Sequence, residues 1–589
     1  MGGEQISLMN GVQRHRGPDA SGVWVSADGC VALGHRRLAI LDLSAGANQP
    51  MISARGTALA FNGEIYNFRE LRAELAGFYE FRTNSDTEVI LAAYEQWGER
   101  CVERFNGMWA FALYDGVQRQ LLLSRDRLGM KPLYVAETVD GLVAASEVKG
   151  ILAAGHKVQV DADGLNEYFT FQNIISQRTL FHGVSMIPPG YNVIIDTATG
   201  RETRREFWRL SFAPLSGDEA TLQEEMLTLF RGAMSRHLIS DVEVGATLSG
   251  GMDSSAIVAL ASEQLRDMHT FTGFFDTSGI DGDDRSYNER EDARRIAARF
   301  RTQHHEREIT PQDVINTLPA IVWHLEDPKV GMCYTFHVIS QLVSSWVTVN
   351  LSGTGGDELF AGYPWRYSLI EKLVDPAAFD ATYYRWWSRL IKEEDKAAFF
   401  TAQIRSATSP EHPRGVFQTL VAGTEHLEPL NRALHFDAKT FLPGFLMVED
   451  KLGMAFGLET RFPFLDRELV DFATRIPTRF KIRDGTAKYM MKQAFQPLLP
   501  AETLQKRKQG FTPPDKTWFR RELKEYIAQM LLSRRSCLGD FIEPNYIRGV
   551  LARHEAGADE RLTIWSLLFF EGWCRVFLKG ETPPMSAVF

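Results

Sequence analysis

Cysteine is scarce in this sequence and is never clustered. The five cysteines are odd in number and none forms a CxxC pair: Cys30, Cys101, Cys333, Cys537 and Cys574. Zinc sites and disulfide frameworks need cysteines at characteristic spacings, so the sequence predicts neither of them. A reducing, cytoplasmic location is therefore expected.

Long apolar runs and an excess of basic residues are lacking as well. No run is long enough to cross a bilayer, and no basic segment followed by an apolar one opens the chain, so neither a membrane span nor a signal peptide is predicted. The net charge of −10 gives no electrostatic reason to expect nucleic acid or a membrane as a partner. The 589 residues, 44% hydrophobic and 24% charged, are typical of a globular protein with two or more domains.

The distribution of apolar residues changes near residue 215. Between residues 23 and 203, short β-like runs are separated by turn signals and interrupted by helical patterns at 67–75 and 87–97, which predicts an α+β region of stacked antiparallel sheets. A linker is expected at 211–219 because Pro214, Ser216 and Gly217 fall there. Beyond it, expected strands alternate with helices, which favours a parallel sheet: strands at 244–248, 270–275 and 348–351, helices at 255–265 and 289–300. A mostly helical part follows from residue 376.

The strongest motif is the segment Gly245–Ser255, GATLSGGMDSS, which follows an apolar strand and opens a helix. Glycines let the backbone approach phosphate oxygens, and free amides at a helix start favour negative charge. Asp253 would repel a phosphate, so its expected role is as a magnesium ligand. The competing interpretation is a strand–helix turn capped by serines, and the density of the pattern argues against it.

Three further motifs follow in order: LSGTGGDELFAGY at 351–363, GLETRFPFLD at 457–466, and KYMMK at 488–492 followed by KRKQGF at 506–511. The first motif resembles the pyrophosphate loop of N-type ATP pyrophosphatases. With the other three in the same order, the chain resembles the glutamine-dependent asparagine synthetases over nearly its whole length. The resemblance implies an α/β ATP pyrophosphatase domain at 219–589, and it allows a homodimer.

The resemblance also implies roles for single residues, with ATP and Mg²⁺ as cofactors. Lys488, Thr354 and Glu358 are the expected catalytic residues, and Asp253 and Asp357 the expected Mg²⁺ ligands. Lys488 suits its role because adenylation and amide formation both build negative charge that a fixed cation stabilises. The expected ATP-binding residues are Leu248, Ser249, Gly250, Gly251, Asp253, Ser254, Ser255, Gly273, Ser352 and Gly353.

The first part of the chain resembles a class II glutamine amidotransferase domain, of the N-terminal-nucleophile fold, over residues 1–210. The resemblance rests on segments 14–19, 34–43, 62–67 and 85–88. It implies that Arg37 binds the glutamine carboxylate, that Glu64 and Asp86 hold its amine, and that Asn62 and Gly63 form an oxyanion hole. On its own, Asn62-Gly63 would read as an ordinary hairpin turn.

The expected nucleophile of that domain is missing from the sequence. Members of the family keep a cysteine directly after the initiator methionine, whereas residue 2 here is Gly2. The HRGPD segment starts at His15, which predicts that the whole first strand is absent. A start placed too far downstream or a shortened chain would explain this, and so would a genuine loss in which ammonia or a substrate amine takes over. Cys30 is not expected to substitute, because N-terminal nucleophiles use their own α-amine as base.

Thr354 is a second departure, because the family usually has an acidic residue there. Threonine can only donate or accept a hydrogen bond. The expected reaction is the ATP-dependent amidation of aspartate, or of another small carboxylate, with glutamine or ammonia as nitrogen source. The alternatives are an intramolecular amide-forming synthetase of the β-lactam or lasso-cyclase type, an ammonia-only synthetase, and an inactive regulator.

Overall fold

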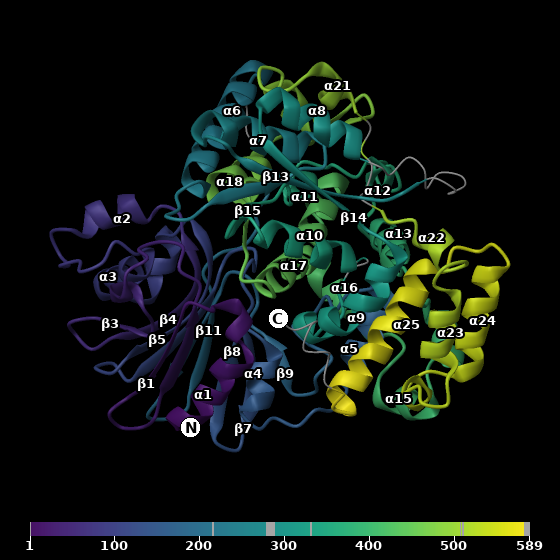
Figure 1. Cartoon of the computed structure of the whole chain (residues 1–589), viewed down its shortest axis with the longest axis horizontal. Helices are drawn as coiled ribbons and strands as arrows, with labels where there is room; N and C mark the ends of the chain where they lie inside the picture. Colours follow the sequence, from purple (N-terminus) through teal and green to yellow (C-terminus); the bar gives the residue numbers. More distant parts are fainter. Residues whose placement is uncertain are drawn as a thin grey trace.

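The computed structural model describes residues 2–214, 217–277, 289–329, 331, 333–506, 508 and 512–581. Its amino-terminal part forms the purple and blue side of the molecule, and the parallel sheet and helices of the remaining chain form the teal, green and yellow parts (Figure 1). Arg507 and residues 509–511 of the KRKQGF motif lie outside the described residues.

The amino-terminal part is built on antiparallel sheets, as the sequence predicted. Its main sheet has the order β11-β10-β6-β5-β4-β3, and two small sheets, β1-β2 and β8-β7-β9, lie beside it. Strand bounds are β1 (Ala20–Val25), β2 (Ala32–Arg37), β3 (Met51–Ile52), β4 (Ala58–Ile65), β5 (Gly107–Asp115), β6 (Gln120–Arg125), β7 (Tyr134–Thr138), β8 (Gly141–Ala145), β9 (Val184–Met186), β10 (Tyr191–Asp196) and β11 (Glu202–Glu206). The helices are α1 (Gly3–Val12), α2 (Phe68–Leu75), α3 (Asp86–Trp97), α4 (Val148–Ala153) and α5 (Ala162–Phe171).

A parallel five-stranded sheet organises the second part, also as predicted. Its order is β14-β13-β12-β15-β16, with bounds β12 (Val244–Thr247), β13 (His269–Phe274), β14 (Gln303–Glu308), β15 (Val349–Leu351) and β16 (Glu459–Arg461). Helices that connect or flank these strands are α6 (Glu219–His237), α7 (Met252–Gln264), α8 (Arg290–Phe300), α9 (Pro311–Leu325), α10 (Tyr334–Ser344) and α11 (Gly356–Leu359). The sequence did not reveal β14, because QHHERE has no apolar run and forms the edge of the sheet.

The last third is helical. In Figure 1, α17 (Pro429–Met454) lies near the middle of the molecule, and α25 (Arg561–Trp573) is the yellow helix at the lower right. The other helices are α12 (Pro364–Tyr367), α13 (Pro376–Trp387), α14 (Lys396–Phe399), α15 (Ala402–Ala407), α16 (His412–Val421), α18 (Arg467–Arg475), α19 (Thr478–Lys481), α20 (Tyr489–Ala494), α21 (Ala501–Gln505), α22 (Asp515–Trp518), α23 (Lys524–Leu532) and α24 (Pro544–Glu555). Two short strands, β17 (Ile482–Arg483) and β18 (Thr486–Ala487), precede α20.

Buried ion pairs join the two parts at α17. Asp450 accepts from Arg16 at 2.8 Å and from Lys131 at 2.9 Å, and all three side chains are at most 5% exposed. Lys451, the next residue, donates to Glu326 at 2.6 Å. Because one unpaired charge here would be costly, the pairs fix how the amino-terminal part sits on α17.

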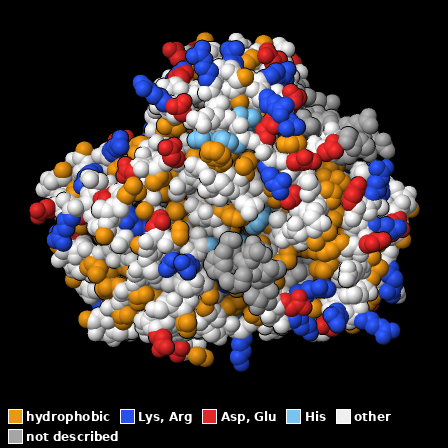
Figure 2. Space-filling view, in the orientation of Figure 1, with side chains coloured by type: hydrophobic (Ala, Val, Ile, Leu, Met, Phe, Trp, Pro, Cys, Tyr) orange, Lys and Arg blue, Asp and Glu red, His pale blue; other side chains and the backbone are white. Residues whose placement is uncertain are grey.

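Acidic and basic side chains are interspersed over the face of the molecule in Figure 2. Among the described residues, no helix combines the length and the apolar character that a membrane span requires.

Candidate active site

The serine-rich loop lies at the carboxyl end of β12, where parallel sheets usually bind ligands. Gly251 precedes the first turn of α7, and the loop is held by its own hydroxyls: Ser254 Oγ accepts from the Ser249 amide at 3.2 Å, and Ser249 Oγ accepts from the Gly251 amide at 3.3 Å. Ser255 Oγ is buried and has no hydrogen-bond partner among the described residues. The helix start therefore offers amides and hydroxyls to an anion.

Two glycines around this loop are sterically required. Gly250 has φ +68°, and a Cβ there would lie 2.5 Å from the Cβ of Asp292. Gly362 leaves room for the side chains of Asp357 and Lys488, because a Cβ there would lie 1.8 Å from Asp357 Oδ1 and 2.5 Å from Lys488 Cε. No other residue type fits either position without displacing its neighbours.

The second predicted ATP segment lies beside the first. β15 pairs with β12 on one side and with β16 on the other, so the loop Ser352–Gly355 emerges at the same edge of the sheet as Ser249–Gly251. Gly353 approaches the first loop closely enough that a Cβ would be 3.2 Å from the Ser254 amide nitrogen. The Leu248 amide donates to the carbonyl of Phe271 in β13 at 2.8 Å. Gly273 follows Phe271 by two residues in the same strand. The predicted ATP-binding residues thus belong to strands, loops and the first turn of α7 at one edge of the sheet.

Two lysines and two aspartates form the charged centre of this site. Lys488 Nζ lies 2.5 Å from both Asp253 Oδ2 and Asp357 Oδ1, and Lys508 Nζ lies 2.6 Å from Asp357 Oδ2. Lys488 is the residue before α20 and adopts φ +54°, a conformation that is uncommon for a non-glycine residue. Such backbone outliers cluster at functional sites, where the surrounding structure over-determines them.

The two aspartates of this centre differ in their proton affinity. Burial would raise the pKa of Asp357, but Lys488 and Lys508 together hold that pKa well below its usual range. The pKa of Asp253 is raised, first by burial and also by Asp357, and Lys488 only partly offsets this. The two lysines thus favour the charged form of Asp357, whereas burial and the Asp357 charge disfavour the charged form of Asp253.

The centre fits a magnesium ion bound together with phosphate oxygens. Asp253 Oδ1 is buried and has no hydrogen-bond partner among the described residues. A carboxylate oxygen is a hard donor, and Mg²⁺ is typically held by one or two carboxylates plus substrate phosphates. The Lys488 ammonium lies between the two carboxylates and pairs with both.

Thr354, in the loop after β15, and Glu358, in α11 directly after that loop, are the two other predicted catalytic residues, and they have different partners. Thr354 Oγ1 donates to Glu449 Oε1 of α17, and Ser352 Oγ donates to Thr354 Oγ1 at 3.2 Å. Glu358 accepts from the Gly355 amide at 2.9 Å and from the Tyr363 hydroxyl. Glu358 thus closes the loop, whereas Thr354 connects it to a buried carboxylate from another helix.

All five residues predicted to bind glutamine line one cavity of about 240 Å³ in the amino-terminal part: Arg37, Asn62, Gly63, Glu64 and Asp86. The cavity lies beneath α1 and over the main sheet, between β2 and β8. In the part of the chain that the structure describes, β2 pairs only with β1 and β8 only with β7. None of the five cysteines is among the residues that line the cavity.

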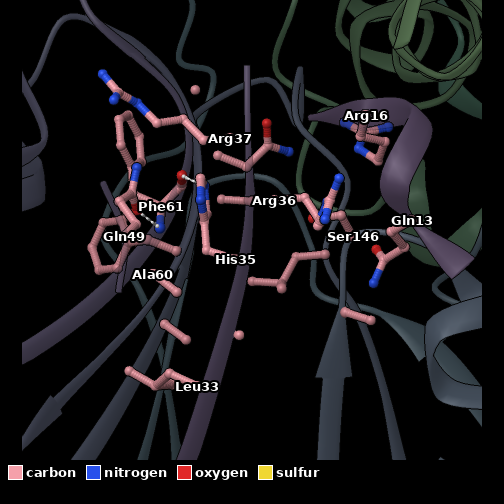
Figure 3. Close-up of a pocket in the computed structure, with 18 of the residues that line it drawn as sticks. Gln13, Arg16, Leu33, His35, Arg36, Arg37, Gln49, Ala60, Phe61 and Ser146 are labelled. Atoms are coloured by element: carbon pink, nitrogen blue, oxygen red, sulfur yellow. Dashed lines mark hydrogen bonds between the residues drawn. The ribbon is translucent and has the colours of Figure 1, made fainter. Parts of the chain in front are cut away.

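The polar groups of this cavity sit on opposite walls. Figure 3 shows Arg37 and the Gln49–Phe61 pair on one side, with Arg16, Gln13 and Ser146 on the other. The Arg37 guanidinium donates to the carbonyl of Ser44 at 2.8 Å and to Asn48 Oδ1 at 2.9 Å, so its position is fixed by the following loop. Asn62 Nδ2 is buried and lacks a hydrogen-bond partner among the described residues, which leaves a donor for a ligand.

The acidic end of the cavity touches the part of the chain that carries the parallel sheet. Ser85 caps α3 by accepting from the Thr87 amide, which places Asp86 in the first turn, where it accepts from the Ile65 amide at 2.8 Å. Burial raises the pKa of Asp86 to about 6. The pKa of Glu64 is raised as well, first by burial and then by the negative charge of Asp86. Glu64 Oε1 lies 3.1 Å from Arg461 Nη2 of β16.

Four residues of this arrangement were not among the predicted site residues. Lys508 and Arg461 stand in motifs that the sequence singled out, but nothing in those motifs says which charge they meet. Gly362 and Glu449 gave a weaker signal, because their roles depend on which side chains the fold brings to them.

Two protein families match consecutive stretches of the chain. The family described as Asparagine synthase matches residues 225–575, and the Glutamine amidotransferase domain family matches residues 2–208. The chain is 32% identical to asparagine synthetase [glutamine-hydrolyzing] 1 of Bacillus subtilis, over 99% of this chain and 95% of that protein. It is 32% identical to a putative asparagine synthetase of Mycobacterium bovis, over 98% and 94%. It is 25% identical to amidase chry2 of Gibberella zeae, over 90% and 88%.

Proposed function

Since this chain belongs to the asparagine synthetase family and catalyses an ATP-dependent amidation, we propose that it converts aspartate to asparagine through an aspartyl adenylate, with glutamine or ammonia as nitrogen source. Residues 1–210 are the proposed glutamine amidotransferase domain, and residues 219–589 the proposed synthetase domain. The observation that carries the proposal is the Asp253–Lys488–Asp357–Lys508 centre at the edge of the parallel sheet.

In the proposed reaction, the loop Ser249–Ser255 holds the β- and γ-phosphates of ATP through its amides and hydroxyls. Asp253 and Asp357 would hold Mg²⁺, which neutralises phosphate charge when bound. The substrate carboxylate attacks the α-phosphorus and pyrophosphate leaves. Ammonia then attacks the acyl carbon and AMP leaves. Lys488 stabilises the negative charge that both steps develop.

The front cavity is the proposed glutamine site. Glu64 and Asp86 would hold the substrate ammonium, and Arg37 would bind the carboxylate. Asn62 and Gly63 would stabilise the oxyanion.

The proposal is tested by AMP release from Mg-ATP and aspartate, with ammonium or glutamine supplied in parallel. AMP and asparagine with ammonium would support the proposal. AMP with glutamine as well would show that a nucleophile is present. A protein that binds ATP but forms no AMP in either case would contradict aspartate as the acceptor.

A larger carboxylate is the second candidate acceptor. Two observations favour it: Thr354 replaces the usual acid of its loop, and a relative covering 90% of this chain is named an amidase. The aromatic side chains of Tyr363 and Trp365, whose rings lie 5.7 Å apart, flank the same loop. Pyrophosphate exchange into ATP, screened over carboxylates of increasing size, separates the two acceptors.

A further inference from the structure

Glu449 is the one carboxylate of α17 that reaches the nucleotide loops. It is 8% exposed, and its Oε1 accepts from Thr354 Oγ1, which in turn accepts from Ser352 Oγ at 3.2 Å. Its neighbours on the helix point elsewhere: Asp450 pairs with Arg16 and Lys131, and Lys451 with Glu326. A helix that otherwise holds the two parts of the molecule together thus places a carboxylate at the proposed reaction centre.

The other acids of this centre already have partners. Asp253 and Asp357 pair with Lys488 and suit the metal, and Glu358 accepts from the Gly355 amide and the Tyr363 hydroxyl. Thr354 carries no group that titrates in the working range. Among the described residues, Glu449 accepts its hydrogen bond from a hydroxyl group and not from a lysine or a backbone amide, so its carboxylate is the acid of this centre best placed to take up a proton.

We propose that Glu449 is the general base of amide formation and accepts a proton from the nitrogen nucleophile as it attacks the acyl adenylate. The inference rests on the proposed function and adds a catalytic residue to it. Thr354 becomes a positioning residue, because its hydroxyl orients the Glu449 carboxylate.

The proton balance of the step requires such an acceptor. Ammonia forms a C–N bond to the acyl carbon, the bond from that carbon to the phosphate oxygen breaks, and AMP leaves with the electron pair. The nitrogen, which would otherwise keep a positive charge, gives one proton to the Glu449 carboxylate. The products are the amide, AMP and protonated Glu449, which releases its proton to solvent before the next turnover.

The electrostatic setting of Glu449 suits this task. Burial raises its pKa to about 7, while hydrogen bonds from Thr354 and Ser352 oppose that rise and the charge of Glu358 on α11 adds to it. A base is most effective when its pKa lies near the operating pH. Below pH 7 the carboxylate is protonated and cannot accept, so the rate of amide formation should fall on the acid side.

The test separates adenylation from amide formation in the full-length protein. Labelled pyrophosphate exchange into ATP measures adenylation, and amide release with hydroxylamine, a nucleophile far less basic than ammonia, measures the second step once the rate is corrected for the uncharged fraction of hydroxylamine at each pH. Glu449→Gln should retain pyrophosphate exchange, but its rate of amide formation should fall about 10²–10⁴-fold. The decline of that rate on the acid side of pH 7, seen in wild type, should disappear in this variant. Glu371→Gln, which changes an exposed glutamate, should match wild type in both.

Wild-type amide formation in Glu449→Gln would overturn the inference and leave the proposed function standing. A wild-type protein that neither exchanges pyrophosphate nor forms an amide would overturn the proposed function and this inference with it.

A second variant tests whether Glu449 is the titrating group. Thr354→Val removes a hydrogen bond that stabilises the carboxylate, so the acid limb of amide formation should move to higher pH. A limb that stays in place would show that another group titrates and would overturn the assignment.

Discussion

At the scale of single residues, the proposed synthetase activity depends on charged side chains that lie close together and are largely buried. Asp357 receives Lys488 on one oxygen and Lys508 on the other, whereas Asp253 keeps one oxygen without a partner among the described residues. Both loops that carry these acids are fixed by hydrogen bonds of their own, so the charges are preorganised before a substrate arrives.

Lys488→Met should abolish most of the synthetase activity. Without this cation, the charge that develops on the phosphate and acyl oxygens is no longer compensated, and AMP release should fall about 10²–10³-fold. AMP formation with ammonium is the measurement, and Lys524→Met, which removes a half-exposed lysine of α23, is the control. An unchanged rate in Lys488→Met would remove the lysine from the proposed mechanism.

Glutamine binding in the front cavity should weaken in mild acid. Burial raises the pKa of Asp86 to about 6, so lowering the pH through 6 protonates it and removes the charge that would hold the substrate ammonium. Well below that value the dissociation constant should rise roughly tenfold per pH unit. Calorimetric titration between pH 5 and 8 measures this, and Asp86→Asn should bind weakly without the same pH dependence. A constant affinity for wild type across that range would contradict the role of Asp86.

At the scale of elements, each site is built where a strand ends and a helix or loop begins. β12 leads to the serine loop and α7, β15 leads to the Thr354 loop and α11, and β4 and α3 bring Glu64 and Asp86 to the front cavity. The backbone conformation at such a junction can be one that only glycine adopts without strain, as at Gly250, so a single substitution there is expected to disturb the site.

Gly250→Ala should impair both stability and ATP binding. At φ +68° with Asp292 in the way, the methyl group must displace the start of α8, which should cost more than about 1 kcal/mol of unfolding free energy. Gly415→Ala is the matched control, because this glycine lies within α16 with no atom within 4 Å of the added Cβ, and it should stabilise by about 0.5–1 kcal/mol. Urea unfolding and ATP titration measure both variants. Equal effects would refute the steric argument.

At the scale of the whole molecule, α17 joins the proposed glutamine cavity to the proposed synthetase site. Asp450 on this helix pairs with Arg16 and Lys131, and Arg461 on β16 reaches Glu64 while its carbonyl accepts from the Ser352 amide at 2.9 Å. The two proposed sites therefore share buried contacts, and their relative position depends on pairs that cannot be broken cheaply.

Arg16→Gln should loosen this junction. Removing one partner of a buried pair leaves charge uncompensated and should cost about 3–5 kcal/mol. We expect calorimetry to show a lower melting temperature and a separate transition for the amino-terminal part. Arg205→Gln removes a surface pair with Glu99 and should cost at most about 1 kcal/mol. A single transition at the wild-type temperature would show that Arg16 does not stabilise the interface.

The sequence by itself determined the chemistry and the fold class. Glycine, serine and acidic residues at close spacing after a strand are typical of a phosphate loop, so Ser249–Ser255 and Ser352–Gly355 could be proposed as binding loops from their local pattern. The order and spacing of apolar runs predicted the antiparallel and the parallel sheet. A strand buried on one face alternates apolar and polar residues, whereas a strand buried on both faces is apolar throughout.

Only the tertiary structure decided which distant charges meet. Glu449 reaches Thr354 across 95 residues, and Asp450 reaches Arg16 across 434. β14 is recognisable only from its pairing with β13, because its side chains carry no apolar pattern. Such contacts depend on how helices and strands pack in three dimensions, and local residue preferences do not encode that packing. The proposed binding loops could therefore be found in the sequence, whereas the contact between Glu449 and Thr354 became visible only in the fold.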